Sequence, residues 1–206
     1  MTESYRDNPR DQLAVIGDPT HLDGQNAIRK FPPGAYLTTK TLHHDDILLA
    51  GWVGLGRARG AASSLIGVLL PGDRIGAILD GRLCTATSLT PVSVAPDGAT
   101  TDGMREIRHL IRQCVRTCHL GASDRIGDFF LETYQRLEAE GLASHWTFAL
   151  PLSQATLGNV LGLSTAHVNR VIKQLQAERR IKIAGREITL LDAAGIAVMG
   201  MNTSIS

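Results

Sequence analysis

Long apolar runs are missing from this chain of 206 residues. The longest begin at Ile47 and Ser64, and both are far shorter than the roughly 20 apolar residues that cross a bilayer. The polar N-terminus has no signal-peptide pattern, so we expect a cytoplasmic protein without a membrane partner. Cysteine is also scarce, since the chain has only three. Their spacing is not that of a zinc site, and so small a number agrees with an intracellular protein.

Catalytic motifs are missing as well. The sequence has no Ser/His/Asp or Cys/His arrangement typical of nucleophilic catalysis and no glycine-rich loop that would hold a phosphate. With 43% hydrophobic and 20% charged residues, its composition is that of a globular protein. We therefore expect a protein that is not an enzyme, with a length that allows two small domains.

A strong net charge is absent too, but the formal value of +1 hides an asymmetry. Residues 145–206 contain six Lys/Arg and three Asp/Glu, which gives a net charge of +3. Residues 1–144 contain fifteen Lys/Arg and seventeen Asp/Glu, which gives a net charge of −2. The positive charge is thus concentrated at the C-terminal end. A partner with phosphates is expected to contact that end.

Short apolar segments separated by turn residues run from about residue 31 to residue 96. They read PPGAYL, DDILLAGWVGL, SSLIGVLLPGD, RIGAIL and LCTATSLTPVSVAPDG. Repeated short strands of this kind predict an all-β sandwich or roll.

The periodicity becomes helical after Thr101. One face of this segment is apolar or small and consists of Ile107, Leu110, Ile111, Cys114, Thr117 and Cys118. The opposite face, which we expect to be exposed, has Arg105, Arg108, Arg112 and Arg116. The narrow apolar stripe indicates a seam against the same helix of a second copy, and the alternative is packing on the β domain.

Two further helical segments precede the basic end. Ser123 is expected to cap a helix that ends at Gly141, with Ile126, Phe129 and Phe130 among its inward residues. The next ten residues, 142–151, read as a loop. Ser153 is then expected to cap a short helix that ends at Gly162.

The pattern after Gly162 predicts a winged helix-turn-helix. Ser164 is expected to cap a second helix, whose buried stripe consists of Val168, Val171, Ile172 and Leu175. A hairpin with Ala184-Gly185 at its tip follows, and its apolar residues alternate with polar ones. In such a motif the first helix braces the second, which is presented outward, and the hairpin is the wing.

The outward face of the second helix has the chemistry of a DNA reader. The expected base-reading residues are Thr165, Ala166, Asn169 and Arg170. Arg pairs with guanine and Asn with adenine in the major groove, while Ala and the Thr methyl suit a thymine methyl. The expected phosphate contacts are Ser164, His167, Lys173, Arg179, Arg180, Lys182 and Arg186. The alternative for the whole face is a solvated basic surface of a module that binds a protein partner. The alternative for His167 is a purely structural role.

At this point the chain resembles the Crp/Fnr superfamily of bacterial transcription regulators. The similarity is most specific in LPLSQATLGNVLGLSTAHVNRVIKQLQAERRIKI, and weaker in FPPGAYL, LLPGDRIGAIL and TATSLTPVSVAP. The resemblance implies an α+β fold with a cyclic-nucleotide-binding-like β-roll (a jelly roll) at 1–100, a long dimerisation helix at 101–122 and a winged helix-turn-helix at 123–206. It implies a homodimer on a two-fold symmetric operator in double-stranded DNA, and RNA polymerase as a partner if the protein is an activator.

Two departures from the family pattern are expected to change function. Family members that bind cyclic AMP have a Gly-Glu pair and an arginine for the cyclic phosphate, where this chain has Gly76-Ala77 and Cys84-Thr85. Arg82 lies two residues away, and the alternative is that it substitutes for the missing arginine after a loop shift. A phosphate buried without its cation is strongly disfavoured, so we expect no useful binding of cyclic AMP. In the second helix of the motif, Ala166 stands where well-known family members have an acidic residue. This difference indicates a DNA half-site that differs from the one those members bind.

No cofactor is expected. Iron–sulfur members of the family use four cysteines, more than this chain contains. Cys114 and Cys118 are interpreted as small apolar residues of the seam, and the alternatives are an intersubunit disulfide or a metal or haem contact. A regulator without any effector is also consistent with the degenerate roll.

The pair His43-His44 raises one rival class, a metal-dependent cupin-like enzyme. Cupins need an H-x-H pair, whereas adjacent residues on a strand point to opposite faces. We therefore expect a solvent-exposed turn at the entry of a strand and no metal site.

Overall fold

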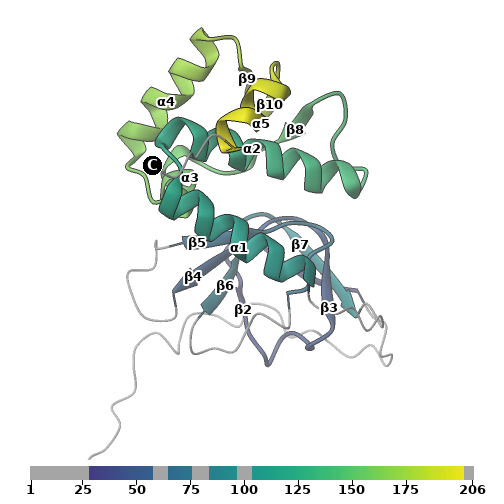
Figure 1. Ribbon diagram of the computed structural model, residues 1–206. Coiled ribbons are helices and arrows are strands. Elements are labelled where there is room, and N and C mark those ends of the chain that lie inside the picture. Colours follow the sequence, from purple (N-terminus) through teal and green to yellow (C-terminus); the bar gives the residue numbers. More distant parts are fainter. Residues whose placement is uncertain (1–27, 58–64, 76–83, 97–103, 202–206) are drawn as a thin grey trace, which may run out of the picture.

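The computed structural model describes residues 28–57, 65–75, 84–96 and 104–201. A β-rich half and a helical half are joined through one long helix, α1 (Met104–His119), which lies along the strands and beneath the other helices (Figure 1). The architecture is therefore the expected α+β fold, with a β-rich half before the first helix and three further strands among the later helices.

The β-rich half consists of two antiparallel sheets. Their strands are β1 (Arg29–Phe31), β2 (Tyr36–Leu37), β3 (Asp46–Ala50), β4 (Val53–Arg57), β5 (Leu65–Leu69), β6 (Cys84–Ser88) and β7 (Val92–Pro96). The order is β1-β7-β3 in one sheet and β2-β6-β4-β5 in the other. Alternate residues of both sheets, among them Leu48, Val53 and Val94, are fully buried in a shared core. This is the predicted β-roll.

One predicted apolar segment divides into two strands that belong to different sheets. The chain turns at Gly51, between β3 and β4, with a φ of 89°. A Cβ at this position would lie 2.1 Å from the carbonyl oxygen of Pro91, so only glycine permits this turn. Most of the predicted segment RIGAIL lies outside the described residues.

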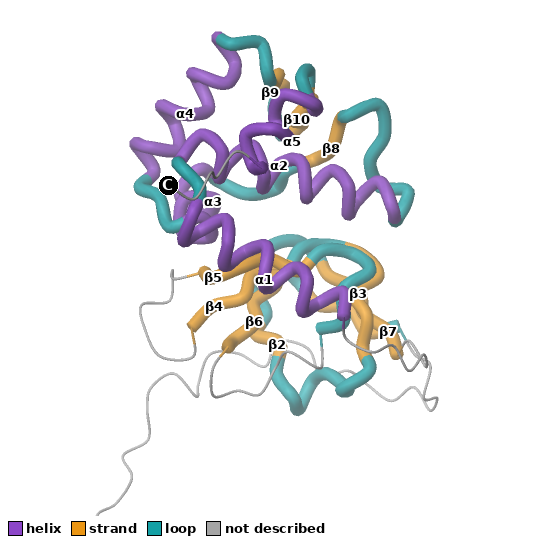
Figure 2. Tube along the Cα trace, viewed as in Figure 1, coloured by secondary structure: helices purple, strands orange, loops and turns teal. Residues whose placement is uncertain are grey.

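The helical half surrounds α2 (Ala122–Ala139). Figure 2 shows the other elements of this half around it. They are β8 (Thr147–Ala149), α3 (Gln154–Leu161), α4 (Thr165–Ala177), β9 (Ile181–Ala184), β10 (Glu187–Leu190) and α5 (Ala193–Met201). The inward residues predicted for α2, including Ile126, Phe129 and Phe130, are confirmed as buried. No helix of the described part is long and apolar enough to cross a membrane.

Three local expectations were wrong, and one helix was missed. The N-cap of α2 is Gly121, and Ser123 lies inside the helix, where its buried hydroxyl has no hydrogen-bond partner among the described residues. The predicted loop 142–151 contains β8, which pairs with β10 and gives the order β8-β10-β9. The wing turn consists of Gly185 and Arg186, because Ala184 is already paired with Glu187. Helix α5 was not predicted at all, and it packs on α2 through the fully buried Ile196.

Candidate nucleic-acid interface

Helices α3 and α4 form the predicted helix-turn-helix. The Ser153 hydroxyl accepts a hydrogen bond from the Thr156 amide at 3.0 Å and caps α3, as predicted. Gly162 ends that helix in the left-handed conformation, with a φ of 65°. The Ser164 hydroxyl then accepts from the His167 amide at 3.2 Å and caps α4. The chain therefore changes direction between two capped helices within three residues.

Gly158 allows the two helices to approach closely. The carbonyl of Gly158 accepts a hydrogen bond from the Leu163 amide at 2.8 Å. A Cβ on Gly158 would lie 2.5 Å from the Leu163 carbonyl oxygen, closer than any real contact. Arg125 of α2 braces the same turn, since its Nη1 donates to the Leu161 carbonyl at 2.8 Å. Sequence reasoning missed both residues, because neither has a charge partner or periodicity that reveals a contact distant in sequence.

The predicted buried stripe of α4 packs in the core of the helical half, and the opposite face is open. Thr165, Ala166 and Arg170 are exposed at its N-terminal part. Asn169 is half-buried, and its side-chain amide donates to the Oε1 of Gln154 at 3.1 Å. Gln154 on α3 therefore orients the Asn169 amide, a contact that no sequence signal indicated.

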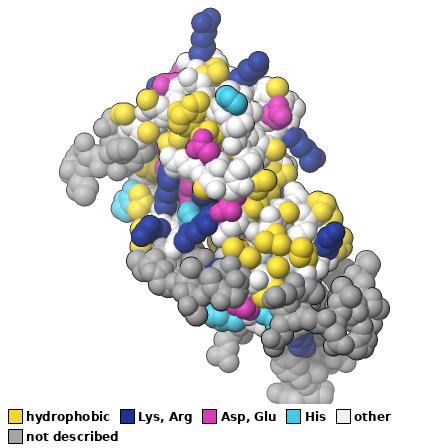
Figure 3. Space-filling model, turned by 90° about the vertical axis from the view of Figure 1, so that its right-hand side faces the viewer, with side chains coloured by type: hydrophobic (Ala, Val, Ile, Leu, Met, Phe, Trp, Pro, Cys, Tyr) yellow, Lys and Arg dark blue, Asp and Glu magenta, His cyan; other side chains and the backbone are white. Residues whose placement is uncertain are grey.

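The other basic residues predicted to contact phosphates differ in solvent exposure and in ion pairing. Lys173 lies farther along α4, and Lys182 and Arg186 lie on the wing; all three are exposed. Arg179 is exposed at the end of α4 and has a φ of 54°, the left-handed region. Arg180 is half-buried, with its Nε 2.9 Å from Glu178, so it is partly neutralised. Lys and Arg side chains project from this end of the molecule (Figure 3).

The face of α1 predicted as a seam is exposed in the single chain. Ile107, Leu110 and Ile111 are 46, 51 and 58% exposed, and Cys114 and Cys118 are also exposed. Thr117 is half-buried and donates to the Gln113 carbonyl. A row of large apolar side chains in solvent is typical of an interaction surface.

The opposite face of α1 is held to α2 by ion pairs. Arg116 was expected to be exposed, but it is 2% exposed and contacts both Asp128 and Glu132 of α2. That expectation was wrong because the helical period alone could not identify the acidic partners on α2. Arg112 also binds Asp128, with its Nη2 2.7 Å from Oδ1. These contacts fix α2 against α1.

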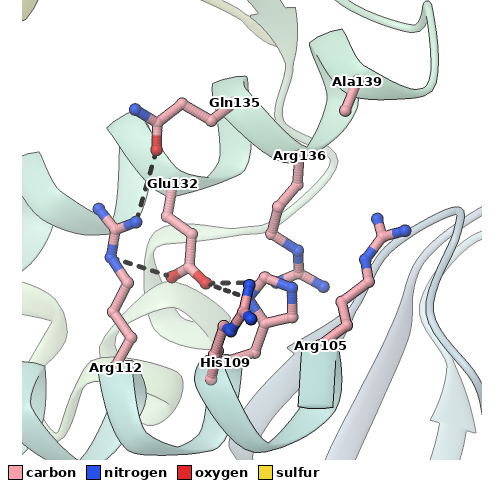
Figure 4. A pocket seen from close by; sticks show the side chains of 8 residues that line it. Arg105, His109, Arg112, Glu132, Gln135, Arg136 and Ala139 are labelled. Carbon is pink, nitrogen blue, oxygen red and sulfur yellow. Dashed lines mark hydrogen bonds and ion pairs between the residues drawn. The ribbon is translucent and has the colours of Figure 1, made fainter. Parts of the chain in front are cut away.

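Glu132 is the buried centre of this network. Figure 4 shows its carboxylate between Arg112 and the pair His109 and Arg136. Burial by itself would raise the pKa of Glu132, but the hydrogen bond from His109 and the charges of Arg116 and Arg136 lower it to about 2. The carboxylate is therefore ionised at neutral pH.

The predicted effector pocket is only partly described. Cys84 and Thr85 lie on β6, paired with Arg57 and Gly56 of β4, and both are half-buried. Gly76, Ala77 and Arg82 lie outside the described residues.

The histidine pair lies in the expected solvent-exposed segment before a strand. His43 and His44 are exposed in the turn before β3. Asp46, two residues after His44, is buried and forms an ion pair with Arg29.

Comparison with known proteins supports this interface. The family model of the Crp-like helix-turn-helix domain matches residues 124–198. The transcriptional activator protein FnrA of Stutzerimonas stutzeri is 30% identical over 95 residues, which are 46% of this chain and 38% of FnrA. The transcriptional regulatory protein btr of Bordetella pertussis is 32% identical over 92 residues, 45% of this chain and 38% of that protein. The matches thus span less than half of either curated relative.

Solved structures extend the similarity to the β-roll. FixK2 from Bradyrhizobium japonicum has a TM-score of 0.67 at 20% identity, and the match covers 84% of this chain and 96% of FixK2. A CRP/FNR family transcriptional regulator from Thermus thermophilus has a TM-score of 0.58 at 17% identity, covering 86% of this chain and 100% of that protein. These similarities establish the fold. Residues 124–198 therefore match the Crp-like helix-turn-helix family, and the fold of the chain is that of the matched regulators rather than one identified with the cupin-like enzyme.

Proposed function

We propose that the protein is a transcription regulator that binds a two-fold symmetric operator in double-stranded DNA as a homodimer. The observation that carries this proposal is the open polar face of α4, presented by a capped helix-turn-helix beside a basic wing. We place the β-roll at residues 1–100, the dimerisation helix at 101–122 and the DNA-binding domain at 123–206. RNA polymerase is a partner if the protein activates transcription.

The residues of the interface divide into two roles. Arg170 and Asn169 contact base edges, and Thr165 and Ala166 contact the edge of the half-site. The phosphate contacts are Ser164, His167, Lys173, Arg179, Arg180, Lys182 and Arg186. The hydrogen bond from Asn169 to Gln154 supports the first role, because it orients the amide before DNA arrives.

Substitution of Arg170 is expected to change specificity. Arg170→Ala removes one bidentate base contact, so discrimination at one base pair of each half-site should fall by about 10- to 100-fold. Arg186→Ala removes a phosphate contact and should weaken all DNA sequences to a similar degree, with a shallower salt dependence. Binding to a panel of single-base operator variants at several salt concentrations measures both effects.

The paired variants also test the assignment of roles. Both side chains are exposed arginines in the helical half, so the change in size and charge is the same. An equal loss of specificity in Arg170→Ala and Arg186→Ala would show that α4 does not read the sequence.

The dimer is proposed to form through α1. Ile107, Ile111, Cys114 and Cys118 are spaced by four, three and four residues, the heptad spacing of a two-stranded coiled coil. Each of these residues would face its own copy across the two-fold axis. Their exposure in the single chain supports this arrangement.

We propose that cyclic AMP does not regulate the protein. Cys84 and Thr85 occupy the positions where cyclic-AMP-binding relatives have an arginine and its neighbour, and neither supplies a cation for a cyclic phosphate. Calorimetric titration of the purified protein with cyclic AMP should give no binding heat at micromolar concentrations. A dissociation constant in the micromolar range or below would refute this point.

A further inference from the structure

A cleft lies on the side of α1 that faces α2, away from the proposed dimer seam. Its volume is about 290 Å³, close to the lower limit of pockets that hold small molecules. The residues that line it are Arg105, Arg108, His109, Arg112, Glu132, Gln135, Arg136 and Ala139. Four of them are arginines from two helices that meet at the cleft (Figure 4).

Most of these arginines have acidic partners. Arg105 lies 3.1 Å from Glu140, Arg112 binds Asp128, and Arg136 binds Asp73 of the turn after β5. The whole cluster has five arginines, counting the buried Arg116. Its acidic residues are Asp73, Asp128, Glu132 and Glu140. One positive charge therefore remains without an acidic partner.

That charge belongs to Arg108. Its side chain is exposed on the cleft wall and has no hydrogen bond or ion pair to any residue in the described ranges. A guanidinium has five N–H donors in a planar fork that suits phosphate and carboxylate oxygens. Arg108 thus presents a complete anion-binding group to the cleft.

Arg136, which lines the cleft on the α2 side, also has an unsatisfied donor. Its Nε is buried and has no acceptor within the described part of the chain. A buried N–H without an acceptor is unfavourable, and because this Nε is closed to solvent, a ligand oxygen can satisfy it only after the Arg136 side chain turns toward the cleft. Arg108 on α1 and Arg136 on α2 would then contact the same ligand from the two helices.

We infer that this cleft binds a small molecule with two or more phosphate or carboxylate groups, and that the ligand regulates the protein. The regulatory part rests on the proposed function. A ligand bound by Arg108 and Arg136 would link the dimerisation helix to the first helix of the DNA-binding domain. It would therefore fix the angle between α1 and α2 at the Leu120-Gly121 connection and change the affinity for DNA.

Calorimetric titration of the full chain with inorganic pyrophosphate, and separately with citrate, tests the site. We expect saturable binding of at least one of them, and Arg108→Gln should weaken it by at least about tenfold. Arg186→Gln is the matched control, since it removes the same charge from an exposed arginine on the wing and should leave binding unchanged. Preference for pyrophosphate or citrate identifies the anionic group.

The outcomes separate this inference from the proposed function. No binding up to about 10 mM, or equal weakening in Arg108→Gln and Arg186→Gln, would overturn the anion site. DNA binding is measured on the same variants without ligand: Arg108→Gln should retain wild-type affinity and Arg186→Gln should lose part of it. If no variant binds DNA but pyrophosphate still binds through Arg108, the proposed function fails and the anion site stands.

Discussion

The Ile111→Glu variant is expected to be a monomer that has lost most of its affinity for operator DNA. Ile111 is 58% exposed in the single chain, so the substitution should not disturb the fold of the subunit. In the proposed dimer two copies of this residue meet at the seam. Two carboxylates would then be desolvated next to one another, which opposes association strongly.

The size of the effect follows from the seam geometry. Each isoleucine that is buried on association contributes about 1.5–3 kcal/mol, and both copies are lost together. The dimer dissociation constant should therefore rise by at least about 100-fold. Affinity for a two-fold operator should fall in parallel, because a monomer occupies a single half-site.

Sedimentation of the wild type and the variant measures the association, and circular dichroism verifies the fold. Val198→Glu is the control, since Val198 is also an exposed aliphatic residue on a helix, at 53%, but lies on α5. It should remain dimeric. A dimeric Ile111→Glu protein would place the interface elsewhere than on this face of α1.

The Gly158→Ala variant is expected to be destabilised, although helix propensity alone predicts the opposite. Alanine is favoured over glycine inside a helix by about 1 kcal/mol. The added Cβ would lie 2.5 Å from the Leu163 carbonyl oxygen, so the turn between α3 and α4 would have to move. Overpacking of this kind costs about 1–3 kcal/mol, and moving the turn would also displace α4.

Urea unfolding measures the free energy of unfolding of the variant. Asn159→Ala, the adjacent exposed position of α3, is the control because it raises helix propensity without a close contact. It should leave stability within about 0.5 kcal/mol of the wild type or raise it slightly. A Gly158→Ala protein as stable as Asn159→Ala would mean that the two helices do not approach as closely as described.

The helix-turn-helix could be predicted from the sequence because its signals are local. The caps Ser153 and Ser164, the stop at Gly162 and the buried stripe of α4 all lie within a few residues of the structure they specify. The sequence also indicated which face of α4 is open, since four buried residues at helical spacing define the opposite side.

Other features depend on contacts distant in sequence and could not be predicted. Arg116 looked like a solvent-facing residue until Asp128 and Glu132, on a different helix, were placed next to it. Strand β8 has three residues and forms only because β10 provides a partner edge. The apolar α5 lacks a helical period, since little of its sequence is polar, and its position on α2 is decided by packing around Ile196.

Selection of bound fragments from a random pool of DNA tests the central claim most directly. The wild-type protein is predicted to enrich a two-fold symmetric site whose half-sites are centred about one helical turn, roughly 10 base pairs, apart. Within each half-site, one base pair should lose its preference when the selection is repeated with Arg170→Ala. Enrichment of no sequence, or of a site without two-fold symmetry, would contradict a homodimer that reads DNA through α4.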